Sequence, residues 1–289
     1  MKHISIFILA AAMGLMLASC NKQAGESRFI TVSAGIGVMT KVDYDGDEAR
    51  FESGDKISVY AWTGNASEVV TPLVVDGVVN TFDGTQWTPE IQMLWDNKSS
   101  KHFFLGISPE RKVTDFTADV YTLDPASFAS SDLMIATNLK GLPPTDNPVA
   151  LNFSHVLARL DVNLTFRSQW ADAPTVTSVT ATGLKTATVN YLDKEMTPTG
   201  TAEAIALLPS ANDAWTGLQV PQDGVRTITI AIDGKNYVFT NSEDIPLVSG
   251  KFTTVNLAVG RDKIDLVNDI TISNWTSQGG AVEGDAEEE

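Results

Sequence analysis

Few side chains in this sequence combine in a pattern that catalysis would need. The single cysteine, Cys20, lies near the start of the chain, and two of the three histidines, His102 and His155, lie in apolar stretches with the pattern of strands. A catalytic base works on a positioned nucleophile, and no Gly-x-Ser-x-Gly turn or phosphate-binding loop occurs. We therefore expect no catalytic residue, no cofactor and no enzymatic activity, and interpret His155 as a structural histidine.

An acidic segment has some of the spacing of a calcium loop. Asp43, Asp45 and Asp47 alternate, so their carboxylates can point toward one hard cation. The match then fails, because Glu48 stands where such a loop requires glycine and Gly54 stands where it requires a bidentate glutamate. We favour a charged hairpin here and expect no metal site.

The six tryptophans allow two interpretations. An exposed indole can stack on a sugar ring, whereas a buried one fills the core or rim of a β-sandwich. We favour the core and keep glycan binding through exposed tryptophan as the alternative.

The beginning of the chain has the parts of a secretory signal. Residues 1–19 comprise a basic start, an apolar run too short to span a bilayer, and small residues. Leu17-Ala18-Ser19-Cys20 resembles the lipobox of bacterial lipoproteins, in which the cysteine is lipidated and becomes the first residue after cleavage. We expect lipid attachment at Cys20, a tether over 20–27 and no other anchor. The alternative is an ordinary signal peptide with a chance cysteine.

Composition indicates a folded, acidic body. The chain has 43% hydrophobic and 19% charged residues, enough apolar surface to bury a sizeable core. After Cys20 no cysteine remains, so we expect no internal disulfide. The net charge of −16 argues against nucleic acid and anionic membrane surfaces as partners.

The hydrophobic pattern predicts an all-β protein. Apolar residues alternate over 55–63 and over 158–166, as in half-buried strands. Asp-Gly pairs at 76–77, 83–84 and 233–234 lie between apolar runs and predict hairpins. No helical period extends over a full helix, and 124–131 can form only a short turn or helix.

The turns suggest two tandem β-sandwich domains. A Pro- and Gly-rich break over 140–148 precedes the clean strand pattern at 158–166, and we place the boundary beside His155. The predicted organisation is an N-terminal domain over 28–155 and a C-terminal domain over 156–277. An acidic tail over 278–289 should be solvated.

Several blocks, taken in order, resemble the fimbrillin-like family. These are a Phe, Gly-Asp and strand block, paired tryptophans, an aromatic strand ending in proline, an Asp-Leu-apolar-apolar-Ala block, a Leu-Asn-Phe-Ser-His segment and a Trp-ended closing strand. They occupy 51–60, Trp87, Trp95, 103–109, 132–136, 149–160, 250–252 and 272–275. The resemblance covers nearly all of the chain after Cys20.

Membership would imply two transthyretin-like β-sandwich domains in a pilus subunit or adhesin, exported as a lipoprotein to the outer surface of a Gram-negative bacterium. In related pilins a trypsin-like protease removes the first strand and a strand from the next subunit replaces it. Here that strand would be 29–36. Lys41 is the first choice of cleavage site and Arg50 the second, although Lys41 can equally be a solvated loop charge.

The resemblance therefore implies a fimbrial subunit or adhesin, anchored to the outer membrane and assembled by strand exchange with other subunits. The closing strand at 264–275 can serve as the donor or stay in its own sandwich. The alternative function is a non-polymerising surface lipoprotein that binds glycans, with a host or bacterial receptor as the partner of either.

Overall fold

The computed structural model describes residues 28–37, 50–170, 172, 174–210 and 213–275. The predicted signal, Cys20 and its tether, Lys41, the Asp43–Asp47 segment and the acidic tail all lie outside the described residues.

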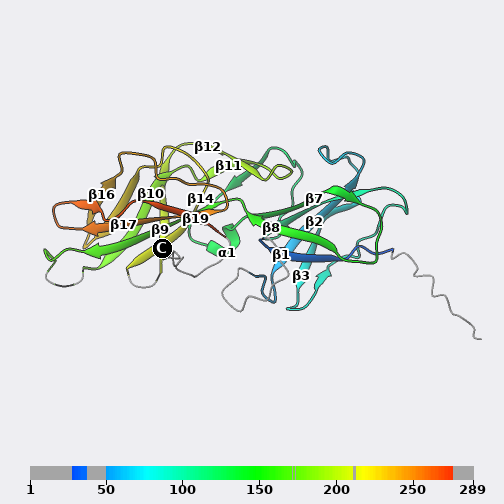
Figure 1. Cartoon of the computed structure of the whole chain (residues 1–289), viewed down its shortest axis with the longest axis horizontal. Coiled ribbons are helices and arrows are strands. Elements are labelled where there is room, and N and C mark those ends of the chain that lie inside the picture. Colours follow the sequence, from blue (N-terminus) through cyan, green and yellow to red (C-terminus); the bar gives the residue numbers. More distant parts are fainter. Residues whose placement is uncertain (1–27, 38–49, 171, 173, 211–212, 276–289) are drawn as a thin grey trace, which may run out of the picture.

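The described chain is almost entirely β-structure, as predicted, and forms an elongated body with a large sheet toward each end (Figure 1). The first sheet, at the right of Figure 1, pairs its strands antiparallel except at one edge, where β1 runs parallel to β8. In spatial order its strands are β1 (Val32–Ile36), β8 (Val149–His155), β7 (Met134–Leu142), β5 (His102–Ser108), β2 (Lys56–Thr63), β3 (Val75–Phe82) and β4 (Trp87–Pro89).

The second sheet, at the left of Figure 1, contains nine strands and is also antiparallel except where β9 runs beside β17. Their spatial order is β16 (Lys235–Thr240), β15 (Thr227–Ile232), β10 (Val176–Gly183), β13 (Glu203–Pro209), β14 (Ala214–Gln219), β9 (Ala158–Phe166), β17 (Lys251–Val259) and β18 (Ile264–Leu266). The ninth strand, β19 (Thr271–Asn274), also pairs with β17.

A third sheet draws on both halves of the chain. The hairpin of β11 (Thr186–Asn190) and β12 (Glu195–Thr199) pairs through β11 with β6 (Asp119–Thr122). The predicted boundary between 155 and 156 falls between β8 and β9, but this sheet takes strands from either side of it. Division into domains at that point stays a prediction.

Three buried clusters form the core. One contains the inner side chains of β1 and one face of the first sheet. Another joins the opposite face of that sheet to β6 and β11. The third belongs to the second sheet and contains inward side chains of β9, β10 and each strand from β13 to β17. The first sheet is therefore covered on both faces.

The burial of both faces of the first sheet corrects one prediction made from the sequence. Strand β2 was expected to be half-buried, with Tyr60 and Trp62 on the face opposite Ile57 and Val59. The two sets do alternate, yet all four side chains are fully buried. The prediction was wrong because residues 186–190, far along the chain, supply a second layer.

The hairpin predicted at Asp76–Gly77 is also wrong. Both residues lie inside β3, where the pairing with β2 shifts register between Val59 and Ala61. Gly77 has φ +64°, and a Cβ there would lie 2.8 Å from the Tyr60 hydroxyl oxygen, so the pair forms a bulge over that buried ring. The other two Asp-Gly pairs do connect antiparallel strands, β3 to β4 and β15 to β16.

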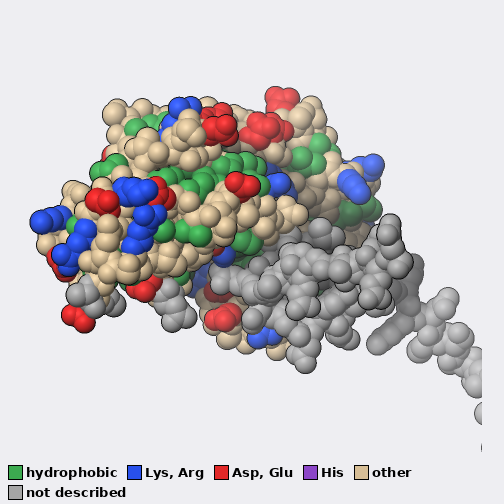
Figure 2. All heavy atoms as spheres, turned by 60° about the vertical axis from the view of Figure 1, so that its left-hand side comes forward, with side chains coloured by type: hydrophobic (Ala, Val, Ile, Leu, Met, Phe, Trp, Pro, Cys, Tyr) green, Lys and Arg blue, Asp and Glu red, His purple; other side chains and the backbone are tan. Residues whose placement is uncertain are grey.

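The short helix α1 (Phe128–Ser131) follows the Ser127 cap within the stretch predicted to hold a turn or helix. No helix in the described part of the chain is long and apolar enough to cross a bilayer. Figure 2, which brings the second sheet forward, shows acidic and basic side chains interspersed over that face.

Candidate strand-exchange groove

Strand β1 forms the rim of the first sheet and fills an apolar slot. Every second side chain faces the buried cluster. Ile30, just before the strand, and Val32 are only 2% and 6% exposed, while Thr31 between them is exposed and Ser33 and Gly35 are half-buried. Ala34 and Ile36 are half-buried and pack against the same cluster. This alternation is what a strand needs in order to fill one side of a groove with every second side chain.

The backbone of β1 is paired mainly along one edge. It runs parallel to β8 from the Val32–Val149 pair to the Ile36–Phe153 pair. Just before the strand, the Ile30 amide donates to the Met93 carbonyl at 2.9 Å. β1 is the outermost of the described strands on its side of the sheet. Its loss would therefore uncover the hydrogen-bonding edge of β8.

Aromatic rings form the floor of the groove. Phe51 packs edge-on against Trp87 and Phe153, with ring centroids 5.0 and 5.4 Å apart. Phe153 also covers Gly106 of β5, where a Cβ would lie 2.7 Å from the ring. These residues belong to the buried cluster that receives Ile30 and the rest of the inner face of β1, so the slot is apolar throughout.

Only one of the two proposed cleavage positions lies among the described residues. Lys41 lies outside the described residues. Arg50 is exposed and borders a cavity of about 470 Å³ that also contacts Ile36, at the end of β1. The next residue, Phe51, is buried in the groove floor. The peptide bond between Arg50 and Phe51 is therefore fixed on its C-terminal side by the buried Phe51 ring.

Similarity to known proteins agrees with this architecture. The family model described as fimbrillin-like matches residues 40–275. The chain belongs to the fimbrillin-like family. The family comprises fimbrial and cell adhesion proteins, which are typically non-enzymatic.

Two solved structures share the fold of this fimbrillin-like chain. A candidate cell adhesion protein of Bacteroides uniformis ATCC 8492 is 20% identical, with a TM-score of 0.65, 86% of this chain covered and 100% of the other. A second, from Bacteroides ovatus ATCC 8483, is 13% identical, with a TM-score of 0.66 and coverages of 87% and 99%. No curated protein matches this fimbrillin-like chain.

Burial of the tryptophans corrects the alternative function. Five of the six are buried, and Trp170 is half-buried with its indole nitrogen donating to the Val259 carbonyl at 3.0 Å. No tryptophan of this fimbrillin-like protein is therefore exposed, because the rings fill the cores and rims of the sheets. The prediction that a glycan stacks on an exposed tryptophan is wrong.

His102 and His155 are both held by contacts with neighbouring protein groups. His102 is fully buried, with its ring nitrogens 3.0 Å from the Ser100 carbonyl and 3.2 Å from the Asp96 amide, and burial lowers its pKa. His155 holds Asp132 through Nδ1 at 2.9 Å and stacks on Trp275. Its Nε2 is buried without a hydrogen-bond partner among the described atoms, so only one of the two ring nitrogens is hydrogen-bonded.

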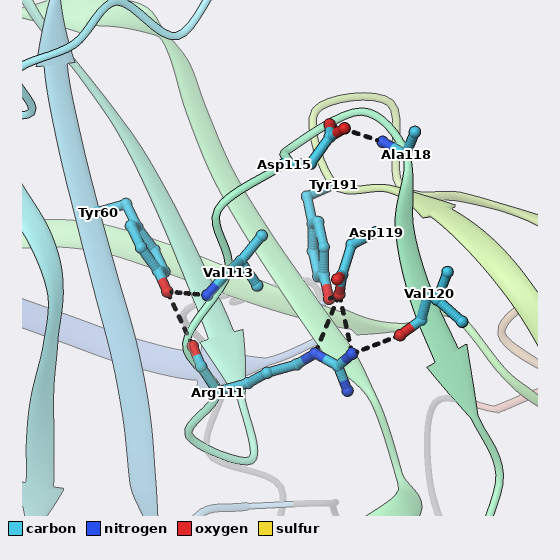
Figure 3. Close-up of polar contacts among 8 residues, drawn as sticks. All are labelled: Tyr60, Arg111, Val113, Asp115, Ala118, Asp119, Val120 and Tyr191. Atoms are coloured by element: carbon cyan, nitrogen blue, oxygen red, sulfur yellow. Dashed lines mark hydrogen bonds and ion pairs between the residues drawn. The ribbon is translucent and has the colours of Figure 1, made fainter.

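A partly buried polar network that the sequence did not predict joins the three-stranded sheet to β2 (Figure 3). The Arg111 guanidinium donates to Asp119 at 2.8 and 3.1 Å, and the Tyr191 hydroxyl donates to the same carboxylate oxygen at 2.8 Å. The Tyr60 hydroxyl donates to the Arg111 carbonyl and accepts from the Val113 amide. Burial raises the pKa of Tyr60 and Tyr191. The hydrogen bond between Tyr191 and Asp119 alone joins residues 72 positions apart, so no local pattern predicts the network.

The closing segment of this fimbrillin-like protein lies in its own sheet. β18 and β19 both pair antiparallel with β17, and Trp275 beyond them is buried. Among the described residues no cluster of His, Cys, Asp and Glu side chains is arranged to hold a metal ion.

Proposed function

We propose that this protein is a lipid-anchored fimbrial subunit or adhesin whose first-sheet groove accepts a strand from a neighbouring subunit after β1 has been removed. The observation that carries the proposal is the placement of β1. It is an edge strand, and its alternate side chains fill an apolar slot bordered by β8. An incoming strand could replace both the backbone hydrogen bonds and the side-chain contacts, as in β-strand addition.

Removal of β1 requires a break in the chain between β1 and β2. Lys41 is our first choice of cleavage site because it follows β1 closely in the sequence. Arg50 is the second choice, because the burial of Phe51 hinders extension of the chain into a protease. A segment released in this way would leave the edge of β8 and the apolar slot open, which favours capture of another strand.

Trypsin treatment tests the exchange. We expect limited digestion of purified protein to cleave after Lys41, release the β1 segment and produce filaments visible by electron microscopy. A Lys41→Gln variant should stay intact and monomeric, and an Arg50→Gln variant should behave as wild type. A protein that loses β1 yet neither polymerises nor binds a peptide with the sequence of 29–36 would refute the proposal.

The anchor is proposed from Leu17-Ala18-Ser19-Cys20. We infer that Cys20 carries the lipid, and that the folded body is displayed on the outer membrane surface. Cells fed labelled palmitate should transfer label to the wild-type protein and not to a Cys20→Ser variant. Absence of label in the wild type would exclude the lipid anchor and leave the exchange proposal to be judged on the trypsin experiment.

A further inference from the structure

The outer face of the second sheet carries a polar groove that strand exchange does not use. A cavity of about 520 Å³ lies over β14, β9 and β17, beside Phe128 of α1 and the Leu208–Pro209 end of β13. This volume is within the range of small-molecule sites.

Neighbouring strands bring polar side chains together on the floor of this groove. The pairing places Thr216 of β14, Asp161 of β9 and Thr254 of β17 in one row across three strands. Asn163 lies two residues further along β9, on the same face as Asp161. The residues between them, such as Val162, point into the opposite, buried face. The floor is thus an ordered array of oxygen and amide groups.

The charges on the floor are fixed and balanced. Arg159 Nη2 lies 2.8 Å from Asp161 Oδ2, and the Thr216 hydroxyl donates to Asp161 Oδ1 at 2.6 Å. The guanidinium also lies over Phe252, 4.7 Å from the ring centroid. Both charged side chains are largely buried, with 12% and 20% of their surface exposed. The groove therefore presents one cation and one anion already paired, which disfavours an ionic ligand.

We propose that this groove binds a neutral saccharide. A sugar hydroxyl can donate to the remaining lone pairs of Asp161 and accept from a second donor at once. The Thr254 hydroxyl lines the groove beside that carboxylate, and the Asn163 amide, which donates one hydrogen to Asn256 Oδ1 at 2.9 Å, keeps a second. The C–H faces of the sugar would lie against the apolar wall of Phe128 and Pro209. Polar groups held in place before binding lower the entropic cost of association. The site does not depend on removal of β1.

The test uses uncleaved protein and an array of neutral glycans terminated by galactose, mannose, fucose or N-acetylglucosamine. We expect binding to at least one of them, weakened about tenfold or more in Asp161→Asn, which keeps the shape of the side chain and removes its charge. Asn163→Ala should weaken binding without disturbing the Arg159–Asp161 pair. Thr229→Ala, on the β15 strand of the same sheet and outside the groove, is the matched control.

Circular dichroism and thermal unfolding of each variant establish that it is folded. The proposal is overturned if the wild type binds no neutral glycan, binds only acidic ones, or retains full binding in both folded groove variants. Because the uncleaved monomer is used, failure of strand exchange would leave this result unaffected.

Discussion

The imidazole of His155 lies flat against the indole of Trp275, with ring centroids 4.0 Å apart and planes 4° from parallel. His155 ends β8, the strand that borders the groove, whereas Trp275 follows β19 of the second sheet. Asp132 holds the imidazole at 2.9 Å, and the Trp275 amide donates to the Gly250 carbonyl at 2.9 Å. This stack therefore joins the groove strand to the closing segment of the second sheet.

Replacing Trp275 with alanine should destabilise the protein by about 3–5 kcal/mol, because it removes a buried aromatic side chain and uncovers His155. Trp275→Phe should cost less, since a ring remains to stack on the imidazole. Urea unfolding followed by circular dichroism measures both. An alanine variant as stable as the wild type would show that the stack is dispensable.

The seating of β1 can be tested with a pair of adjacent substitutions. Val32→Asp places a charge in the apolar slot and should lower the free energy of unfolding by about 3 kcal/mol or more, or release β1 altogether. Thr31→Asp places the same charge on an exposed position and should change stability by less than about 0.5 kcal/mol. Hydrogen exchange across β8 gives the readout. Equal protection of β8 in the two variants would contradict the assignment of the slot.

Gly106→Ala should crowd the floor of the groove. Its Cβ would lie 2.7 Å from the Phe153 ring, and overpacking of this kind costs about 1–3 kcal/mol. Shortening the obstructing side chain in the double variant Gly106→Ala/Phe153→Leu should recover part of the loss relative to Phe153→Leu alone. A double-mutant cycle measures the coupling, and additive effects would argue against a direct clash.

Alkaline pH should weaken the fold through its buried tyrosines. Burial raises the pKa of Tyr60 and Tyr191 above the ordinary value of 10.0, so near that pH the unfolded chain loses protons that the folded chain keeps. Stability is thus complete below about pH 10 and falls as pH rises further, by at most about 1.4 kcal/mol per pH unit for each tyrosine until the pH reaches its folded-state pKa.

Tyr191→Phe should make that decline shallower, at a cost of about 1.5–3 kcal/mol near neutral pH for the lost hydrogen bond to the Asp119 carboxylate. Urea midpoints measured from pH 7 to 11 give both quantities. An identical slope in the variant would exclude Tyr191 as a contributor to the alkaline transition.

Local patterns predicted the strands well where one face meets solvent. The alternation over 158–166 matches β9 residue for residue, and the Asp-Gly pair at 233–234 forms its predicted hairpin. Prediction failed at β2, where a hairpin more than 120 positions later covers the second face. At Gly77 the Tyr60 ring of the neighbouring strand β2 lies against the backbone, where the expected hairpin is a bulge in β3.

For the candidate site, the sequence identified the first strand at 29–36 but neither its alternating packing nor the direction of its pairing. Parallel alignment of Val32 with Val149 is set by a contact over 117 positions of chain, which no local turn encodes. The Arg111–Asp119–Tyr191 network was missed for the same reason. Arg111 and Asp119 look like ordinary surface charges until the folded chain brings Tyr191 beside them.

The pairing of β11 with β6 has a mechanical consequence. In the filament we propose, each subunit would be pulled from its two ends, and the force would pass through hydrogen bonds that link Thr186–Val189 to Asp119–Thr122. Stretching the molecule would load these bonds together rather than extend a loose connector. We expect the folded body to unfold under tension in a single cooperative step.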